Sequence, residues 1–264
     1  MRRNFILGDC RPHVCTKTVM ISVRYENALA RCTIDIGKVN AFGRADIHEL
    51  EDLIESLNHD FPEKIRAVSF ESSKISPKGL PIFCAGADQK ERVGWSSEEI
   101  LSHVAWQRSV IHQLRQSPLH VICCVDGYAL GLGTEICLAA DSVIATPKAV
   151  FGFPEKSWGL IPGAGGYAWA HGWAPHPEDA QFYIERETRL DSEHAQWLGI
   201  VDILAEDTSD FELQIDYLMG FILYESPEDQ MAHKKNYHEK IDYKLLFEQE
   251  QEAYAQCIKR KGIA

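Results

Sequence analysis

The spacing of apolar residues predicts both strands and helices in the first part of the chain. Residues 19–25 and 28–36 are typical of two strands, with Glu26 and Asn27 as the turn between them. In residues 45–57 the apolar positions recur every three or four residues, which is helical spacing. A short strand is predicted at 67–70.

The middle of the chain repeats this order of elements. Residues 97–116 have helical spacing, and Ser97 is the predicted N-cap of that helix. Residues 121–125 are all apolar, which is typical of a strand buried on both faces. A glycine-rich turn follows, and the next predicted elements are a helix at about 134–140 and short strands at 143–145 and 149–151.

Beyond residue 160 the pattern is almost entirely helical, and residues 245–257 have the spacing of an amphipathic helix. Repeated strand–strand–helix units followed by a helical tail predict a single α/β domain. Three regions are expected, namely a loose extension over 1–17, the α/β core over 18–206 and a helical region over 207–264.

Charge and composition exclude several classes of partner. A formal net charge of -12 argues against nucleic acid or an anionic membrane surface, although a few local cations can still hold a phosphate. No apolar stretch approaches the length of about 18–20 residues that a membrane span needs. The eight cysteines form no C-x-x-C pair, so a metal site is not predicted and a reduced, cytoplasmic location is favoured.

Three segments combine glycines, carboxylates and predicted strand-to-helix junctions, at residues 83–88, 127–135 and 151–166. A glycine-rich turn at the start of a helix presents free backbone N–H groups, and two such turns facing each other would form an oxyanion hole. Each segment alone is better explained as a structural turn, because glycine turns are common. The middle segment has the spacing G-x-x-x-G-x-G, which disfavours a dinucleotide-binding turn.

Two glutamates in these segments are candidates for acid–base chemistry. Glu135 is followed by three apolar residues, and a carboxylate in such surroundings should have a raised pKa. Glu155 follows Pro154 and precedes a glycine-rich loop. Singly, Glu135 is also explained as a complement to the helix dipole, and Glu155 as a solvated turn residue. Together, beside two amide-presenting turns, they suggest a paired acid and base.

Over about residues 19–206 the sequence resembles the enoyl-CoA hydratase/isomerase (crotonase) superfamily. Asn40-Ala41-Phe42 is similar to the N-A-L segment of that family, and residues 83–88 match its A-G-x-D motif. Residues 127–135 resemble the motif V-N-G-x-A-x-G-G-G-x-E. The resemblance implies the crotonase fold, a spiral of ββα units with a C-terminal helical region.

The resemblance also implies roles for individual residues. The backbone amides of Ala87 and Leu132 would form the oxyanion hole, Glu135 would orient and deprotonate water, and Glu155 would supply the α-proton. The implied reaction is syn addition of water to a 2-enoyl-CoA, giving a 3-hydroxyacyl-CoA. It needs no metal or redox cofactor, and coenzyme A enters as part of the substrate. Further residues expected to contact the substrate are Ala41, Ala85, Gly86, Asp88, Lys90 and Gly131.

The sequence departs from the family pattern at three places. Leu132 replaces a small residue, and its side chain either crowds the thioester or fills space behind it. The aromatic and histidine residues of 167–177 either reshape the acyl pocket or, as favoured here, pack in the core. After residue 257 the chain lacks the Phe-rich, basic segment that helps to cover the CoA adenine in the family, which leaves both CoA and an acyl carrier protein open as the carrier.

Two other functions are compatible with these motifs. One is isomerisation or dehydration of a thioester on the same scaffold. The other is a non-catalytic protein that binds thioesters or serves in assembly, in which the two glutamates would point away from any pocket or Leu132 would plug the oxyanion site. The family resemblance further implies a homotrimer or a hexamer built as a dimer of trimers, with 207–264 as the trimerisation region.

Overall fold

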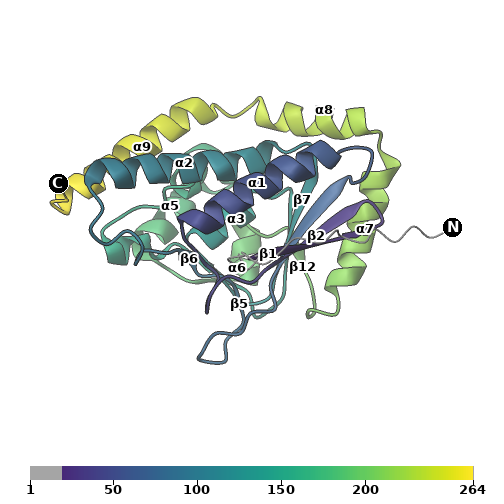
Figure 1. Ribbon diagram of the computed structural model, residues 1–264, viewed down its shortest axis with the longest axis horizontal. Coiled ribbons are helices and arrows are strands. Elements are labelled where there is room, and N and C mark those ends of the chain that lie inside the picture. The colour runs from purple at the N-terminus through teal and green to yellow at the C-terminus, as the bar shows by residue number, and fades with distance from the viewer. Residues whose placement is uncertain (1–19, 264) are drawn as a thin grey trace, which may run out of the picture.

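The computed structural model describes residues 20–263 and is a mixed α/β structure (Figure 1). The extension predicted for residues 1–17 lies outside the described residues. The large sheet has the strand order β1-β2-β4-β7-β9-β12. Its strands are β1 (Ile21–Glu26), β2 (Leu29–Ile34), β4 (Ala67–Glu71), β7 (His120–Val125), β9 (Ser142–Ala145) and β12 (Ile203–Leu204).

Two smaller sheets accompany the large one. The first has the order β11-β10-β8-β5, and the second pairs β3 with β6. Their strands are β3 (Ala41–Phe42), β5 (Ile82–Cys84), β6 (Gly86–Ala87), β8 (Tyr128–Leu130), β10 (Val150–Gly152) and β11 (Leu190–Asp191). Only the β1–β2 and β10–β11 pairs are antiparallel, and the other pairs among the described strands are parallel.

The helices follow the strands at regular intervals. They are α1 (Arg44–Asp60), α2 (Ser97–Gln116), α3 (Leu132–Ala139), the 3-10 helix η1 (Pro154–Trp158), α4 (Gly166–Gly172), α5 (Pro177–Arg186), α6 (Ser192–Trp197), α7 (Phe211–Tyr224), α8 (Pro227–His238) and α9 (Tyr243–Arg260).

The chain forms a spiral in which successive units repeat the order strand, strand, helix. In each unit the first strand joins the large sheet and the second joins a smaller one, as in β2-β3-α1, β4-β5-β6-α2 and β7-β8-α3. The next pair, β9 and β10, leads into η1 and α4. This order confirms the predicted spiral of ββα units with a helical C-terminal region. Equivalent turns of successive units therefore lie beside one another.

The large sheet is buried on both faces, as the apolar run at 121–125 predicts. Alternate β7 residues contribute to two different cores, because side chains alternate across a strand. Val121, Cys123 and Val125 belong to the main core, together with residues of α1, α2 and α3. Ile122 and Cys124 belong to a second cluster, in which the opposite face of the sheet packs against the apolar side of α7.

Helices α7, α8 and α9 run along the outer edge of the molecule, from the sheet over the top to the far side (Figure 1). The last of them, α9, returns to pack against α2 and α4. A small third cluster forms there, with Ile100 and Val104 of α2 against Tyr254 and Ile258 of α9. The C-terminal helix therefore belongs to the part of the fold that contains the glycine-rich turns.

The structure corrects several predicted boundaries. The first hairpin turns at Asn27 and Ala28, one residue later than predicted, and both have positive φ as a two-residue type I′ turn requires. The N-cap of α2 is Ser96, not Ser97, because its hydroxyl accepts the Glu99 amide at 3.3 Å while the Glu99 carboxylate accepts the Ser96 amide at 2.8 Å. Helix α3 begins at Leu132, earlier than predicted.

Short strands make up most of the elements that the sequence pattern did not predict. Strands β11 and β12 interrupt the region predicted to be helical, and β3, β6 and β8 contain two or three residues each. Such pieces are too short to show a periodic pattern of their own. Strands β6 and β8 nevertheless lie within the glycine-rich segments 83–88 and 127–135.

Replacement of Ile122 by Ala should destabilise the protein by about 2–5 kcal/mol, because the side chain is fully buried between sheet and helix α7. Urea denaturation followed by circular dichroism measures this loss. Ile75→Ala is the matched control, since Ile75 is 58% exposed, and it should cost less than about 1 kcal/mol. Equal losses in the two variants would contradict the assignment of the second core.

Candidate active site

The second, third and fourth units of the spiral place their turns around one small cavity. Ala87, Leu132, Glu135 and Glu155 all line it, and its volume is about 30 Å³. These are the four residues that the sequence analysis assigned to the oxyanion hole and to acid–base chemistry. The structure therefore brings them together from segments separated by up to about seventy residues of sequence.

Gly86 allows two of these turns to approach closely. Its φ of +108° is strained for other residues. A Cβ atom there would lie 3.0 Å from the carbonyl oxygen of Leu130 and 3.7 Å from the amide nitrogen of Leu132. Strand β6, which carries Gly86 and Ala87, thus passes directly beside the start of α3. The pairing of Ala41 with Gly86 and of Phe42 with Ala87 holds this strand in place.

The second turn delivers the Leu132 amide to the same place. Gly131 is the N-cap of α3, with a φ of +52°, and its amide donates to the Gly152 carbonyl at 2.8 Å. Leu132 is the first residue of the helix, where backbone N–H groups have no intrahelical partner. Its side chain is buried among the residues of the main core, as well as lining the cavity.

Glu135 is buried and held by backbone amides. Its side chain is 4% exposed, and Oε1 accepts the amides of Ala164 at 2.7 Å and Gly166 at 3.0 Å. Burial raises the pKa of this carboxyl to about 7, and the nearby Glu250 charge adds to the rise, while the two amides and Arg108 oppose it. A group with this pKa exchanges protons readily near neutral pH.

Glu155 reaches the cavity from η1. Its Oε2 atom is buried and has no hydrogen-bond partner, and its Oε1 atom occupies the space that a Cβ on Gly131 would fill. Burial raises the pKa of Glu155 well above the ordinary value, and the charge of Glu135 raises it further. Burial and the neighbouring Glu135 charge thus both favour the protonated form of Glu155.

Glu250 of helix α9 is part of this arrangement and was missed in the sequence analysis. It is fully buried, and its carboxylate pairs with Arg108 Nε at 2.6 Å. The same carboxylate accepts the amides of Gly165 at 3.1 Å and Ala168 at 2.9 Å. Arg108 Nε also donates to the Gly163 carbonyl at 3.0 Å. The turn at 163–168 is thus fixed by Arg108 and Glu250 on one side while it binds Glu135 on the other.

One signal for Glu250 exists in the sequence. It occupies a position in the apolar stripe of α9 between Phe247 and Tyr254, where a carboxylate needs a buried partner. Tyr254, one turn further along, lines the active-site cavity, and burial raises the pKa of its hydroxyl to about 12. Arg92 and Gln107 also line the cavity and are joined by a hydrogen bond of 2.9 Å.

The remaining residues expected to contact substrate are not among those that line this cavity. These are Ala41, Ala85, Gly86, Asp88, Lys90 and Gly131. Asp88 accepts the Lys90 amide at 2.9 Å, which shapes the loop after β6. The Lys90 side chain is exposed. Trp169, from the aromatic segment at 167–177, packs in the main core as favoured from the sequence.

Residues 20–263 contain neither a metal-binding cluster nor a membrane-spanning helix. They contain no group of three or more His, Cys, Asp or Glu side chains arranged to hold a metal ion. Among these residues there is also no helix with the length and apolar character needed to cross a membrane.

The family model for enoyl-CoA hydratase/isomerase matches residues 24–261, so the chain belongs to that family. The solved structure of an enoyl-CoA hydratase from Bacillus anthracis has a TM-score of 0.74 and 26% identity, with 91% of both chains covered. A hydratase structure from Bacillus halodurans, with a TM-score of 0.80 and 19% identity, shares the fold; 92% of this chain and 97% of that one are covered.

Curated relatives match part of the sequence. Enoyl-CoA hydratase domain-containing protein 2, mitochondrial, from Mus musculus is 36% identical over 166 residues, which cover 60% of this chain and 53% of the relative. Human methylglutaconyl-CoA hydratase, mitochondrial, is 33% identical over 151 residues, covering 55% of this chain and 42% of the relative. The matched part thus spans about half the length of these relatives.

The raised pKa of Glu135 predicts a pH-dependent stability. In the folded protein Glu135 keeps its proton up to a pH of about 7, whereas in the unfolded chain it loses the proton near pH 4.5. The free energy of unfolding therefore falls as the pH rises from 4.5 to about 7. Glu135→Gln cannot ionise, and its melting temperature should rise relative to the parent between pH 5 and 8, on the order of 5 °C. Scanning calorimetry across this range measures the difference. If the melting temperatures of the two proteins changed with pH in parallel, the raised pKa of buried Glu135 would be contradicted.

Proposed function

We propose that the protein is an enoyl-CoA hydratase that adds water to a 2-enoyl-CoA thioester. The observation that carries this proposal is the pair Glu135 and Glu155, which line one small cavity with Ala87 and Leu132. Hydration of a conjugated thioester needs a base for water, an acid for the α-carbon and donors for the enolate oxygen. The cavity walls offer a group for each of these tasks.

The two glutamates differ in the way that the reaction requires. Glu135, with a pKa of about 7, takes a proton from water as the water oxygen bonds to the β-carbon. The electron pair of the double bond moves to the thioester oxygen, which the amides of Ala87 and Leu132 stabilise. Glu155, whose protonated form is favoured by burial, then donates its proton to the α-carbon, and the product is a 3-hydroxyacyl thioester. No metal or redox cofactor enters these steps.

The site disfavours the non-catalytic alternative. That hypothesis expects either that the glutamates point away from the pocket or that Leu132 plugs the oxyanion site. Both glutamates line the cavity, and the Leu132 side chain is buried among main-core residues as well as lining the cavity. Isomerisation and dehydration use the same acid and base, so they remain rivals on the same site, and product analysis separates them. Coenzyme A is the proposed carrier, supported by the names of the relatives, and an acyl carrier protein is the alternative.

The proposed location is a reducing compartment, with the cytoplasm as the expected one. It is supported by the six cysteines among the described residues, which are all buried free thiols. The names of two relatives contain the word mitochondrial, and the mitochondrial matrix is the alternative location. Fractionation of cells that express the natural gene distinguishes the two.

Purified protein should deplete the conjugated-thioester absorbance of crotonyl-CoA and form 3-hydroxybutyryl-CoA. Glu135→Gln and Glu155→Gln should each lower kcat by about 10²–10⁴-fold, because each removes one proton-transfer group. Glu252→Gln is the matched control, since Glu252 is exposed on α9, and it should retain full activity. Parent-like activity in both active-site variants would contradict the mechanism, and 3-enoyl products would favour an isomerase.

We also propose a homotrimer, or a hexamer of two trimers, in which residues 207–264 supply contacts. Support comes from α7, where Leu213, Tyr217, Phe221 and Tyr224 recur at helical spacing on an exposed face. Large apolar patches of this kind are typical of interaction surfaces.

Sedimentation equilibrium should give three or six times the mass of 29.9 kDa for the parent protein. Phe221→Asp should shift the distribution toward monomer, because it places a charge in the apolar face of α7. The control Leu80→Asp changes an exposed residue outside α7, in the loop before β5, and should leave the mass of the assembly unchanged. A monomeric parent would reject the proposed assembly.

A further inference from the structure

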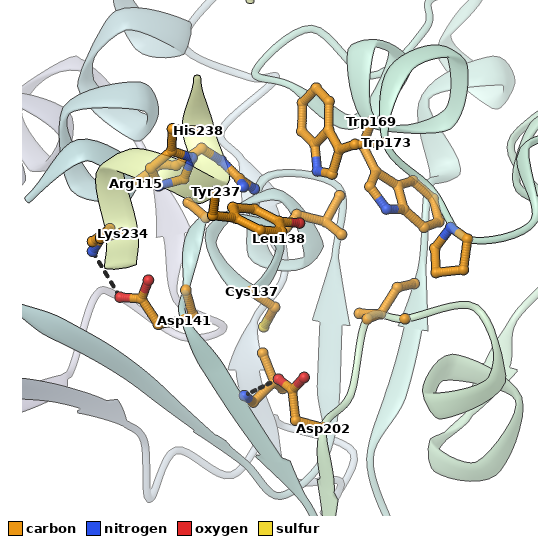
Figure 2. A pocket seen from close by; sticks show the side chains of 16 residues that line it. Arg115, Cys137, Leu138, Asp141, Trp169, Trp173, Asp202, Lys234, Tyr237 and His238 are labelled. Atoms are coloured by element: carbon orange, nitrogen blue, oxygen red, sulfur yellow. Dashed lines mark hydrogen bonds and ion pairs between the residues drawn. The ribbon is translucent and has the colours of Figure 1, made fainter. Parts of the chain in front are cut away.

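A second cavity, of about 300 Å³, lies at the opposite end of helix α3 from the candidate active site (Figure 2). The catalytic glutamate is in the first turn of α3, whereas Cys137, Leu138 and Ala139 from its last turn line this cavity. The other walls come from the end of α2, from α4 and from α8. Its volume is at the lower end of the range for small-molecule sites, about 300–1,000 Å³.

A buried arginine without a counter-charge lines this cavity. Arg115, in the last turn of α2, is 7% exposed and forms no ion pair with any carboxylate of residues 20–263. Its guanidinium instead lies over aromatic rings, 4.9 Å from the ring centre of Trp173 and 5.9 Å from that of Tyr243. A buried charge without a partner is costly, even where aromatic faces offset part of the cost.

The other buried arginines of the described region show what Arg115 lacks. Arg31 pairs with Glu26 and Glu212, and Arg108 pairs with Glu250. Arg66 donates to the side chain of Gln230 and to two backbone carbonyls. In each of these cases protein groups accept the guanidinium hydrogens. Arg115 has the Tyr243 hydroxyl as a hydrogen-bond partner but no carboxylate among the described residues, so the geometry leaves a negative charge to be supplied by a molecule in the cavity.

The groups next to Arg115 do not neutralise it. Lys234 forms an ion pair with Asp141 at 2.7 Å, so the charges of these two side chains offset each other. His238 shares a hydrogen bond with the Tyr243 hydroxyl through Nδ1, at 2.8 Å. Burial lowers the pKa of His238 to about 4, and the charges of Arg115 and Lys234 lower it further, whereas Asp141 opposes them. The Arg115 side of the cavity is therefore positively polarised.

The rest of the cavity combines apolar and aromatic walls with polar groups, and it has a carboxylate away from Arg115. Leu138, Trp173, Ile200 and Tyr237 form walls, and Figure 2 shows Tyr237 and His238 near Arg115. The Trp173 ring also lies beside Arg115, with its centre 4.9 Å from the guanidinium carbon. Asp202 lies elsewhere on the lining, in the lower part of Figure 2, and accepts the Val143 amide at 2.8 Å. The negative charge of Asp202 disfavours a second carboxylate on a ligand at that end of the cavity.

We propose that this cavity binds a small aromatic monocarboxylate, with its carboxylate on Arg115 and its ring against Trp173. A planar guanidinium matches a carboxylate through two parallel hydrogen bonds, which makes this head group a better fit than a neutral one. The site is separate from the cavity that contains Glu135 and Glu155, so the proposal does not depend on the hydratase reaction.

Benzoate tests the proposal by isothermal titration calorimetry on the full chain at pH 7. We expect saturable binding of one benzoate per chain, with benzamide and terephthalate at least about tenfold weaker, since benzamide lacks the charge and terephthalate brings a second one toward Asp202. Arg115→Gln should weaken benzoate by about tenfold or more. Glu155→Gln should leave benzoate affinity unchanged, because Glu155 lines the other cavity.

Arg186→Gln is the matched control, since Arg186 is an exposed arginine that lies over the ring of Phe182 outside the cavity, and it should bind benzoate as the parent does. If Arg115→Gln does not fold, the comparison of benzoate with benzamide on the parent protein decides the matter. Equal affinity for these two ligands, no binding of benzoate, or loss of benzoate binding in Glu155→Gln would each overturn the proposal.

Discussion

The candidate active site depends on one short turn, residues 163–168, whose backbone amides are shared between two buried carboxylates. Ala164 and Gly166 donate to Glu135, and Gly165 and Ala168 donate to Glu250. Burying a carboxylate is costly unless donors surround it. The alternation of donors along this turn allows two acids to be buried near each other, and the ion pair of Glu250 with Arg108 stabilises the second of them.

The spiral explains why the turn at 163–168 lies beside the other segments of the site. Each unit of the spiral ends its second strand at the same level, so the turn after β6, the turn into α3 and the segment after β10 lie beside one another. Gly86 and Gly131 are needed at these places because neighbouring backbone and the Glu155 side chain approach them closely. The repeated architecture thus gathers amide donors and carboxylates from distant parts of the sequence without long connecting loops.

Much of this could be predicted from the sequence, because the motifs around Ala87, Leu132, Glu135 and Glu155 are local and contain glycines at defined spacing. The fold class follows from the repeated strand–strand–helix order. The role of Glu250 could not be predicted in the same way, since its partners Arg108 and Ala168 lie 142 and 82 residues away in the chain. The short strands β11 and β12 escaped prediction because tertiary pairing, not a periodic pattern, determines them.

The position of helix α9 at the end of the described chain affects how the site forms during synthesis. It supplies Glu250 and Tyr254 to the site, and it is synthesised after every other element described. The ββα spiral can pack while the chain is still emerging from the ribosome, yet the 163–168 turn acquires its second carboxylate only when α9 arrives. Until then Arg108 lacks its acidic partner and the wall formed by Tyr254 is missing, so the nascent chain carries an incomplete site through almost its whole synthesis.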